Sequence, residues 1–83
     1  MTFRVHVRVM PRAGLLDPQG QAVERALGSL GFEGAGEVRI GRAIELDVDA
    51  PSAAVAETRA REMCDRLLAN PVMEDYTLAV EAR

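Results

Sequence analysis

Side chains alternate strictly in type over residues 3–10, and this pattern constrains the fold of the chain more than any other feature. The odd positions hold phenylalanine and valine, whereas the even positions hold arginine, histidine and methionine. Successive side chains of a β-strand point to opposite faces, so the pattern predicts one apolar and one polar face. A half-buried strand of this kind needs other elements to cover its apolar face.

Three further alternating stretches predict the other strands. Residues 38–40 and 44–48 alternate on either side of Gly41-Arg42, a Gly-X pair typical of a two-residue hairpin. Residues 76–80 alternate again near the end of the sequence. We therefore expect an antiparallel sheet of four strands.

Two segments carry helical spacing. Asp17-Pro18 offers a capping carboxylate followed by a proline in the first turn, and Gly31 is placed to end this helix in the left-handed conformation. A second helix opens at residues 50–52 and runs to about Ala69, where Asn70-Pro71 stops it. Its predicted buried stripe comprises Ala56, Ala60, Met63, Cys64, Leu67 and Leu68.

These elements follow one another in the order β-α-β-β-α-β. That order predicts an α+β fold of ferredoxin-like type, a two-layer sandwich with two helices on one face of an antiparallel sheet. We expect one domain spanning residues 1–83. The other sheet face is left uncovered, and it can be solvated or can dock a second subunit. Opposite charges would meet there across neighbouring strands, from Arg4, His6, Arg8, Glu45, Asp47 and Asp49.

Composition excludes several functions and favours self-association. The chain has one cysteine and one histidine, which are too few for a disulfide or a zinc site. A core this small is of modest stability, so we expect a homodimer or tetramer. The net charge of −3 and the scattered arginines argue against nucleic acid as a partner. No apolar run reaches the ~20 residues of a membrane span, and no secretion signal is recognisable. We therefore expect a cytoplasmic protein without membrane association.

No set of residues has the spacing of a catalytic site. Cys64 falls on the apolar stripe of the second helix, where a free thiol is usually a small hydrophobic residue. His6 lies on the charged strand face without a nucleophile nearby, which favours a surface or interface histidine. The glycines of residues 34–36 precede a strand rather than a helix, so they form a loop and not a dinucleotide site.

Two loops are of more interest. Arg12-Ala13-Gly14 occupies the place where acylphosphatases of this fold bind phosphate, but Asp17 at the following helix start would repel an anion. Glu74 and Asp75 point to opposite sides of an extended segment and so make a poor acid–base pair. We expect both to face solvent, in a loop that presents polar groups to a partner.

Three stretches carry a family resemblance. They are residues 16–20, residues 38–42 with 44–46, and the C-terminal decapeptide of residues 67–76, Leu-Leu-Ala-Asn-Pro-Val-Met-Glu-Asp-Tyr. In this order and spacing they resemble the PurS family, the small subunits of phosphoribosylformylglycinamidine synthase, and the decapeptide is the most specific element. Arg42 stands where lysine is expected and Met73 where isoleucine is commoner, and both replacements keep the charge or the bulk.

This resemblance implies a non-catalytic assembly subunit in de novo purine biosynthesis. PurS-like subunits join an ATP-using synthetase (PurL) and a glutaminase (PurQ). Together these enzymes convert formylglycinamide ribonucleotide, glutamine and ATP to formylglycinamidine ribonucleotide. The chain would bridge the two enzymes so that ammonia reaches the synthetase, and it would be an enzyme only as a subunit of this ligase. No cofactor is implied in this chain, since ATP and Mg²⁺ belong to the synthetase. The candidate partner contacts are Asp17, Gln19, Arg42, Asn70, Glu74, Asp75 and Tyr76.

Two other functions are compatible with the same element order. A small ACT-like regulatory domain binds an amino acid and often dimerises, but it leaves residues 70–76 unexplained. An acylphosphatase-like enzyme is the less favoured alternative, because Asp17 occupies the approach to the phosphate loop.

Overall fold

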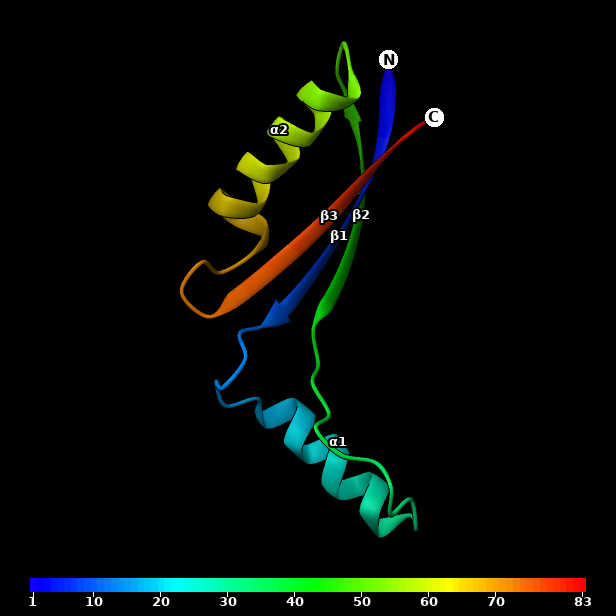
Figure 1. Cartoon of the computed structure of the whole chain (residues 1–83), viewed down its shortest axis with the longest axis vertical. Helices are drawn as coiled ribbons and strands as arrows, with labels where there is room; N and C mark the ends of the chain where they lie inside the picture. The colour runs from blue at the N-terminus through cyan, green and yellow to red at the C-terminus, as the bar shows by residue number, and fades with distance from the viewer.

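A long central strand organises the fold. In the computed structural model, which describes residues 1–83, three antiparallel strands form one sheet of order β2-β1-β3, and both helices are present (Figure 1). The predicted α+β class with an antiparallel sheet is therefore confirmed. The elements are β1 (Thr2–Pro11), α1 (Pro18–Ser29), β2 (Arg42–Asp49), α2 (Ala53–Met63), a π-helical turn η1 (Cys64–Leu68) and β3 (Glu74–Ala82).

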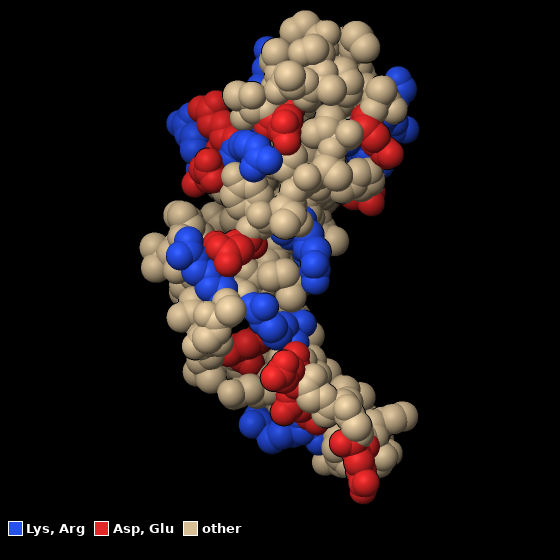
Figure 2. Space-filling view, viewed as in Figure 1, with Lys and Arg blue, Asp and Glu red and all other residues tan.

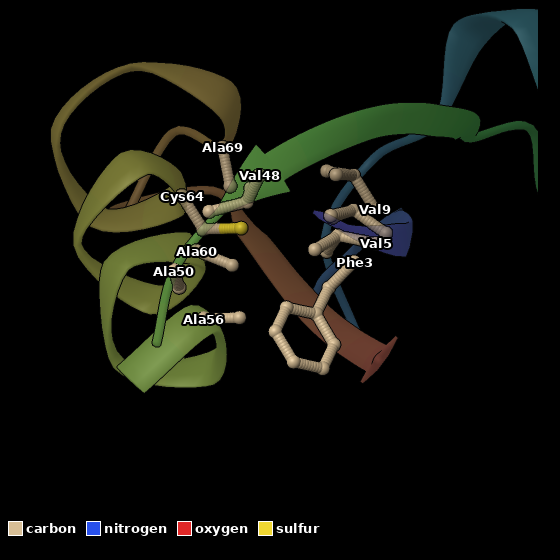
Figure 3. Packing of buried hydrophobic residues seen from close by; sticks show 10 residues of the cluster. Phe3, Val5, Val9, Val48, Ala50, Ala56, Ala60, Cys64 and Ala69 are labelled. Carbon is tan, nitrogen blue, oxygen red and sulfur yellow. The ribbon is translucent and has the colours of Figure 1, made fainter. Parts of the chain in front are cut away.

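The core lies between the sheet and α2 (Figure 3). The side chains of Phe3 and of the three valines of β1 are buried, and Val5 and Val9 are fully enclosed. α2 contributes Ala56 and Ala60, whose small side chains let the helix approach the sheet closely. Burial of each valine stabilises the fold by roughly 1.5–3 kcal/mol. The buried cluster comprises Phe3, Val5, Val7, Val9, Val48, Ala50, Ala56, Ala60, Cys64 and Ala69.

The second helix ends differently from its prediction. Its α-helical part stops at Met63, and the π-helical turn that follows is closed by a hydrogen bond from the Ala69 N–H to the Cys64 carbonyl, 3.0 Å. A π-helical turn holds more residues than an α-helical one, so the face presented to the sheet shifts. Cys64 is buried as predicted, but Leu67 is 82% exposed and Met63 lies at the surface. The assignment of Leu67 and Met63 to the buried stripe was wrong, whereas Leu68 packs at the edge of the core.

No strand forms at residues 38–40, so the predicted hairpin at Gly41-Arg42 is absent. The outer edge of β2, which the hairpin would have occupied, has no partner strand in this chain. The backbone donors of the expected strand are used elsewhere. The Val38 N–H donates to Glu24 Oε1 at 3.2 Å, and the Ile40 N–H donates to Asp17 Oδ2 at 2.9 Å. Residues 38–40 therefore run back beside α1 instead of joining the sheet.

The first helix does not cover the sheet, as the two-layer prediction required, but extends beyond its end (Figure 1). The sheet packs against α2, and the buried core, which includes Val7 and Val9, contains no residue of α1. We call α1 together with residues 30–40 the arm. It makes the molecule elongated, with principal extents of 51 × 26 × 14 Å. Neither helix has the length and apolarity needed to cross a membrane.

The predicted ends of α1 are confirmed. At its start, Asp17 Oδ1 accepts the Gly20 N–H at 2.9 Å. At its end, Gly31 has a φ of +94°, and the Phe32 N–H donates back to the Leu27 carbonyl at 3.0 Å. This pattern satisfies backbone groups that a helix end would otherwise leave unpaired.

The uncovered sheet face carries a ladder of charges. Arg4 lies opposite Asp47 on β2, and its Nε donates to Asp47 Oδ1 at 2.7 Å. His6 lies between two carboxylates, with 2.9 Å from Nε2 to Glu81 Oε1 and 3.4 Å from Nδ1 to Glu45 Oε1. The expectation that opposite charges meet across these strands is confirmed for Arg4 and His6. Figure 2 shows charges of both signs interspersed over the molecule rather than gathered in one large area.

Candidate functional site

Three segments that are distant in the sequence meet where the arm joins the sheet. They line a cleft of about 700 Å³, which we call the junction cleft, with residues from segments 11–19, 40–42 and 70–74. These segments contain parts of all three stretches that carry the family resemblance. Five of the seven candidate contact residues line it, namely Asp17, Gln19, Arg42, Asn70 and Glu74.

Asp17 anchors the arm side of the cleft. One carboxylate oxygen accepts the Gly20 N–H and the other accepts the Ile40 N–H, both at 2.9 Å. These two backbone hydrogen bonds hold the pKa of Asp17 below its usual value. A side chain at Gly20 would place its Cβ 2.2 Å from the Val38 carbonyl oxygen, so only glycine fits there. The helix start is thus occupied by a carboxylate, and the acylphosphatase-like alternative finds no support.

Arg42 and Glu74 form the opposite wall. Arg42 Nη1 donates to Glu74 Oε2 at 2.8 Å, and Arg42 Nη2 donates to Glu74 Oε1 at 3.1 Å and to the Leu68 carbonyl at 2.8 Å. Glu74 Oε1 also accepts the Asn70 N–H at 2.7 Å. The hydrogen bond from Arg42, and then that from Asn70, lowers the pKa of Glu74. The Glu74 side chain is only 19% exposed, so the expectation that it faces solvent was wrong.

Asn70 shapes the turn that connects η1 to β3. Its side-chain Oδ1 accepts the Val72 N–H at 3.0 Å, and its carbonyl accepts the Glu74 N–H at 2.8 Å. Asparagine is typical of such turns because its side chain can bond the backbone two residues further on. The turn holds Val72 and Met73 at the surface, where both side chains are exposed. It therefore presents apolar groups, and not only polar ones, to the outside.

Arg12 holds the same turn from the other side, and sequence reasoning missed this role. Its backbone N–H donates to the Met73 carbonyl at 2.9 Å, and its side-chain Nη2 donates to the Pro71 carbonyl at 2.6 Å. Its Nε lies 3.4 Å from Asp75 Oδ1. The pairing of Pro11 with Glu74 places Arg12 opposite the turn, so this role follows from the register. The sequence pattern alone gives the end of β1 but not the register.

The remaining two candidates lie outside the junction cleft. Asp75 and Tyr76 line a smaller hollow of about 340 Å³ together with Arg12. The Tyr76 hydroxyl donates to Asp65 Oδ1 at 3.0 Å, and partial burial with this bond raises the pKa of Tyr76. The expected exposure of Asp75 is confirmed, since its side chain is 70% exposed.

The cleft has the properties of a contact surface. Arg42 pairs with Glu74, Asp17 accepts backbone N–H groups, and Leu15, Leu16 and Met73 line the cleft with exposed apolar side chains. Exposed apolar side chains beside polar groups are typical of protein interfaces. The one thiol, Cys64, is buried away from the cleft, and burial raises its pKa, which disfavours the reactive thiolate. The fold and the cleft together define a small α+β protein that acts through binding to other proteins.

Comparison with known proteins identifies the family. The family model described as "PurS: Phosphoribosylformylglycinamidine (FGAM) synthase" matches residues 4–82. This chain belongs to the PurS family. It is 42% identical to the PurS subunit of phosphoribosylformylglycinamidine synthase of Synechocystis over 98% of this chain and 81% of that protein. The first expected function, rather than the ACT-like or acylphosphatase-like one, is thereby supported.

Solved structures share the fold. PurS of Methanocaldococcus jannaschii, described as one of the subunits of formylglycinamide ribonucleotide amidotransferase, superposes with a TM-score of 0.87 at 33% identity, over 98% of each chain. A chain in the structure of PurLQS from Thermotoga maritima superposes with a TM-score of 0.89 at 30% identity, over 96% of this chain and 98% of that one. The extended arm is therefore part of a fold that is similar to the solved structures along nearly its whole length.

Proposed function

We propose that this chain is the assembly subunit of a phosphoribosylformylglycinamidine synthase and bridges a PurL-type synthetase and a PurQ-type glutaminase. The observation that carries the proposal is the convergence of the three family-typical segments on the junction cleft. Segments that are distant in sequence and serve only folding need not meet at one surface. The structure named PurLQS, whose matching chain is similar to this one, adds weight to the choice of partners.

The proposed role is to keep ammonia from escaping between two active sites. The glutaminase releases ammonia from glutamine, and the synthetase uses ATP to transfer it to formylglycinamide ribonucleotide. In this proposal ATP and Mg²⁺ bind the synthetase, the catalytic cysteine belongs to the glutaminase, and this chain binds no cofactor. Its contribution is geometric, because holding two enzymes together raises the effective concentration of each for the other. The proposal includes a cytoplasmic location for the complex.

The contact residues of the proposal divide by what they touch. Gln19, Asn70 and Met73 line the cleft, and Val72 is exposed on the same turn. These groups are available to a partner. Asp17, Arg42 and Glu74 are engaged within the chain and shape the surface. Asp75 and Tyr76 extend the same surface beyond Arg12.

Self-association as a homodimer or tetramer is part of the proposal. The arm leaves a row of large apolar side chains uncovered, because α1 does not pack on its own sheet. Both outer strands, β2 and β3, also have one edge without a partner strand. A second copy that covered these groups would stabilise a small core. The exposed side chains of the arm and of the loop leading into it are Leu15, Leu16, Val23, Leu30 and Phe32.

Reconstitution tests the proposed function directly. The synthetase and glutaminase of the same organism are assayed with and without this chain, using glutamine or ammonium as the nitrogen source. We expect glutamine-dependent formation of formylglycinamidine ribonucleotide to require the chain, and ammonium-dependent formation by the synthetase to proceed without it. Equal glutamine-dependent rates in the absence of the chain would contradict the proposal.

A further inference from the structure

The uncovered sheet face is electrically balanced at one end and unbalanced at the other. The register places Arg4 between Asp47 and Glu81, so the guanidinium has a carboxylate on each neighbouring strand. Four residues further along β1, Arg8 lies between Ala43 and Thr77, neither of which can carry a charge. No carboxylate lies within 4.0 Å of the Arg8 guanidinium. The unpaired end is the one nearest the arm.

A second arginine without a partner borders the same place. Arg39 comes from the returning segment of the arm, and it lines with Arg8 a groove of about 590 Å³ on the uncovered face. We call this the basic groove. Arg39 has no carboxylate within 4.0 Å either. Arg42 forms the ridge between the basic groove and the junction cleft, because it lines both.

Nearby carboxylates do not neutralise this pair, because each is already bound. Glu45, the one carboxylate that lines the groove, contacts Arg4 at 3.3 Å and His6 at 3.4 Å. Glu74 accepts two hydrogen bonds from Arg42, and Asp75 pairs with Arg12. Asp17 interacts with Arg39 only through its charge, since its two oxygens accept backbone N–H groups. Arg8 and Arg39 therefore form no ion pair within 4.0 Å, in a chain of net charge −3.

Small side chains line the basic groove beside the central strand. Ala43 and Thr77 lie on either side of Arg8, and Ala79 lies beside His6. Small residues leave room for a polypeptide backbone to lie against the sheet. The groove has no phenylalanine, tyrosine or tryptophan ring on which a base would stack and borders no helix N-terminus, which are the usual features of a nucleotide or phosphate site. Guanidinium groups match carboxylates well because they donate two parallel hydrogen bonds.

We propose that the basic groove binds an acidic chain segment of a large partner subunit, through Arg8 and Arg39. This inference rests on the proposed function and extends it to a second contact surface beside the junction cleft. The two surfaces share Arg42, so one partner can cover both. Charge pairs of this kind accelerate association and make binding sensitive to ionic strength.

Titration of charge variants against the partners tests this surface. Arg8→Ala/Arg39→Ala is compared with Arg59→Ala/Arg66→Ala, which removes the same number of charges from exposed positions on α2 and η1. Each is fluorescently labelled and titrated with purified synthetase, purified glutaminase and their mixture, at low and at physiological ionic strength. We expect the groove variant to raise the Kd of one partner at least about tenfold and to lose most of the salt dependence. The control variant Arg59→Ala/Arg66→Ala should bind as the wild type does, and Arg8→Lys/Arg39→Lys should recover part of the affinity. Equal melting temperatures of the variants establish that folding is intact.

Each other result assigns the groove differently and overturns the proposal. Unchanged affinity of the groove variant for both partners would do so while leaving the proposed function standing. A changed sedimentation coefficient with unchanged partner affinity would assign the groove to a second copy. Stabilisation of the wild type, but not of the variant, by millimolar inorganic phosphate would assign it to a small anion. Failure of the wild type itself to bind either partner would refute the proposed function, and with it this extension.

Discussion

Glu74 joins three parts of the chain through one carboxylate. It binds Arg42 at the start of β2, accepts the Asn70 N–H of the turn, and begins β3 itself. Arg42 in turn holds the Leu68 carbonyl at the end of η1. Removing this side chain would free the guanidinium and the turn at once. The residue therefore acts on the cleft by fixing its shape, and any effect on a partner is indirect.

Glu74→Ala should lower the melting temperature of the isolated chain by about 5 °C, the scale on which a domain of this size responds to one lost interaction. Differential scanning calorimetry measures the shift. Glu57→Ala is the matched control, because Glu57 pairs with Arg61 on the exposed side of α2 at i,i+4 spacing. That variant should melt within about 1 °C of the wild type. Equal melting of the two variants would show that the Arg42–Glu74 pair does not organise the turn.

His6 gives the sheet a pH-dependent contact. The hydrogen bond with Glu81 is the largest influence on each group, raising the pKa of His6 above 6.5 and lowering that of Glu81 below 4.5. The His6 contribution is complete below its unfolded pKa and is lost as pH rises through the raised folded value. The Glu81 contribution is complete above its unfolded pKa and is lost as pH falls. The pair therefore stabilises the sheet most between about pH 4.5 and 6.5. The other charged groups on this face are Arg4, Arg8, Glu45, Asp47, Asp49 and Arg83.

Melting curves at pH 6 and pH 8 check this contact. The wild type should lose stability between the two pH values, and His6→Gln should lose less, because glutamine does not titrate. The pKa values of Asp47 and Glu81 are lowered by their partners, so these two carboxylates do not contribute to the difference. An identical loss in the variant would assign the pH dependence to other groups.

At the scale of elements, local sequence patterns predicted most of the features that depend on local sequence alone. The alternation over residues 3–10 gave β1, and Asp17 and Gly31 gave the two ends of α1. Residues 38–40 have the same alternation but form no strand, because the backbone N–H groups of Val38 and Ile40 donate to Glu24 and Asp17 instead of to β2. The π-helical turn was also missed, since one extra residue in a turn leaves no mark in the composition.

The candidate site was predictable to the same extent. The family-typical segments contain the five candidate contact residues that line the junction cleft. That these residues meet there depends on the position of the arm. Arg12 was weighed only as a phosphate ligand, because its contacts with the turn arise from pairing between β1 and β3. The sequence shows which residues are candidates for the site. Which distant residues contact one another depends on the register between the strands.

Gly20→Ala should detach the returning segment from α1. The added Cβ would lie 2.2 Å from the Val38 carbonyl oxygen and 2.6 Å from Asp17 Oδ2, so the segment must move. We expect a destabilisation of ~1–3 kcal/mol and faster hydrogen exchange at the Val38 and Ile40 amides. Gly28→Ala is the matched control in the same helix, because nothing lies within 4 Å of its added Cβ.

That control should behave in the opposite way. Replacement of a helical glycine by alanine stabilises a helix by up to ~1 kcal/mol. Chemical denaturation and hydrogen exchange measured by NMR distinguish the two variants. Similar exchange rates at Val38 in both would show that the segment is not held through Gly20.

At the scale of the whole molecule, the arm carries large apolar side chains that the rest of the chain leaves exposed. Leu30 is 73% exposed and Phe32 is 59% exposed, both at its far end. Apolar side chains of this size, outside any core, are typical of surfaces that another chain covers. The sheet and α2 form a core without the arm, so folding and association rest on different parts of the molecule.

Leu30→Ser/Phe32→Ser should weaken self-association without unfolding the core. Sedimentation equilibrium at micromolar concentration should show an oligomer for the wild type and a shift toward the 9.0 kDa monomer for the variant. Leu67→Ser is the control, since Leu67 is 82% exposed on the sheet body rather than on the arm. A wild type that sediments only as a monomer would contradict the proposed homo-oligomer, and an effect of Leu67→Ser equal to that of the arm variant would contradict the role of the arm.

The two ends of the chain meet at the end of the sheet opposite the arm (Figure 1). The Met1 amino group lies 3.3 Å from Asp49 Oδ1, and the Arg83 N–H donates to the Thr2 carbonyl at 3.0 Å. An affinity tag, a dye or a surface tether can therefore be attached at either terminus without standing in front of the junction cleft. The chain can be immobilised by this end with its arm pointing into solution, which is the orientation needed to capture its partners one at a time.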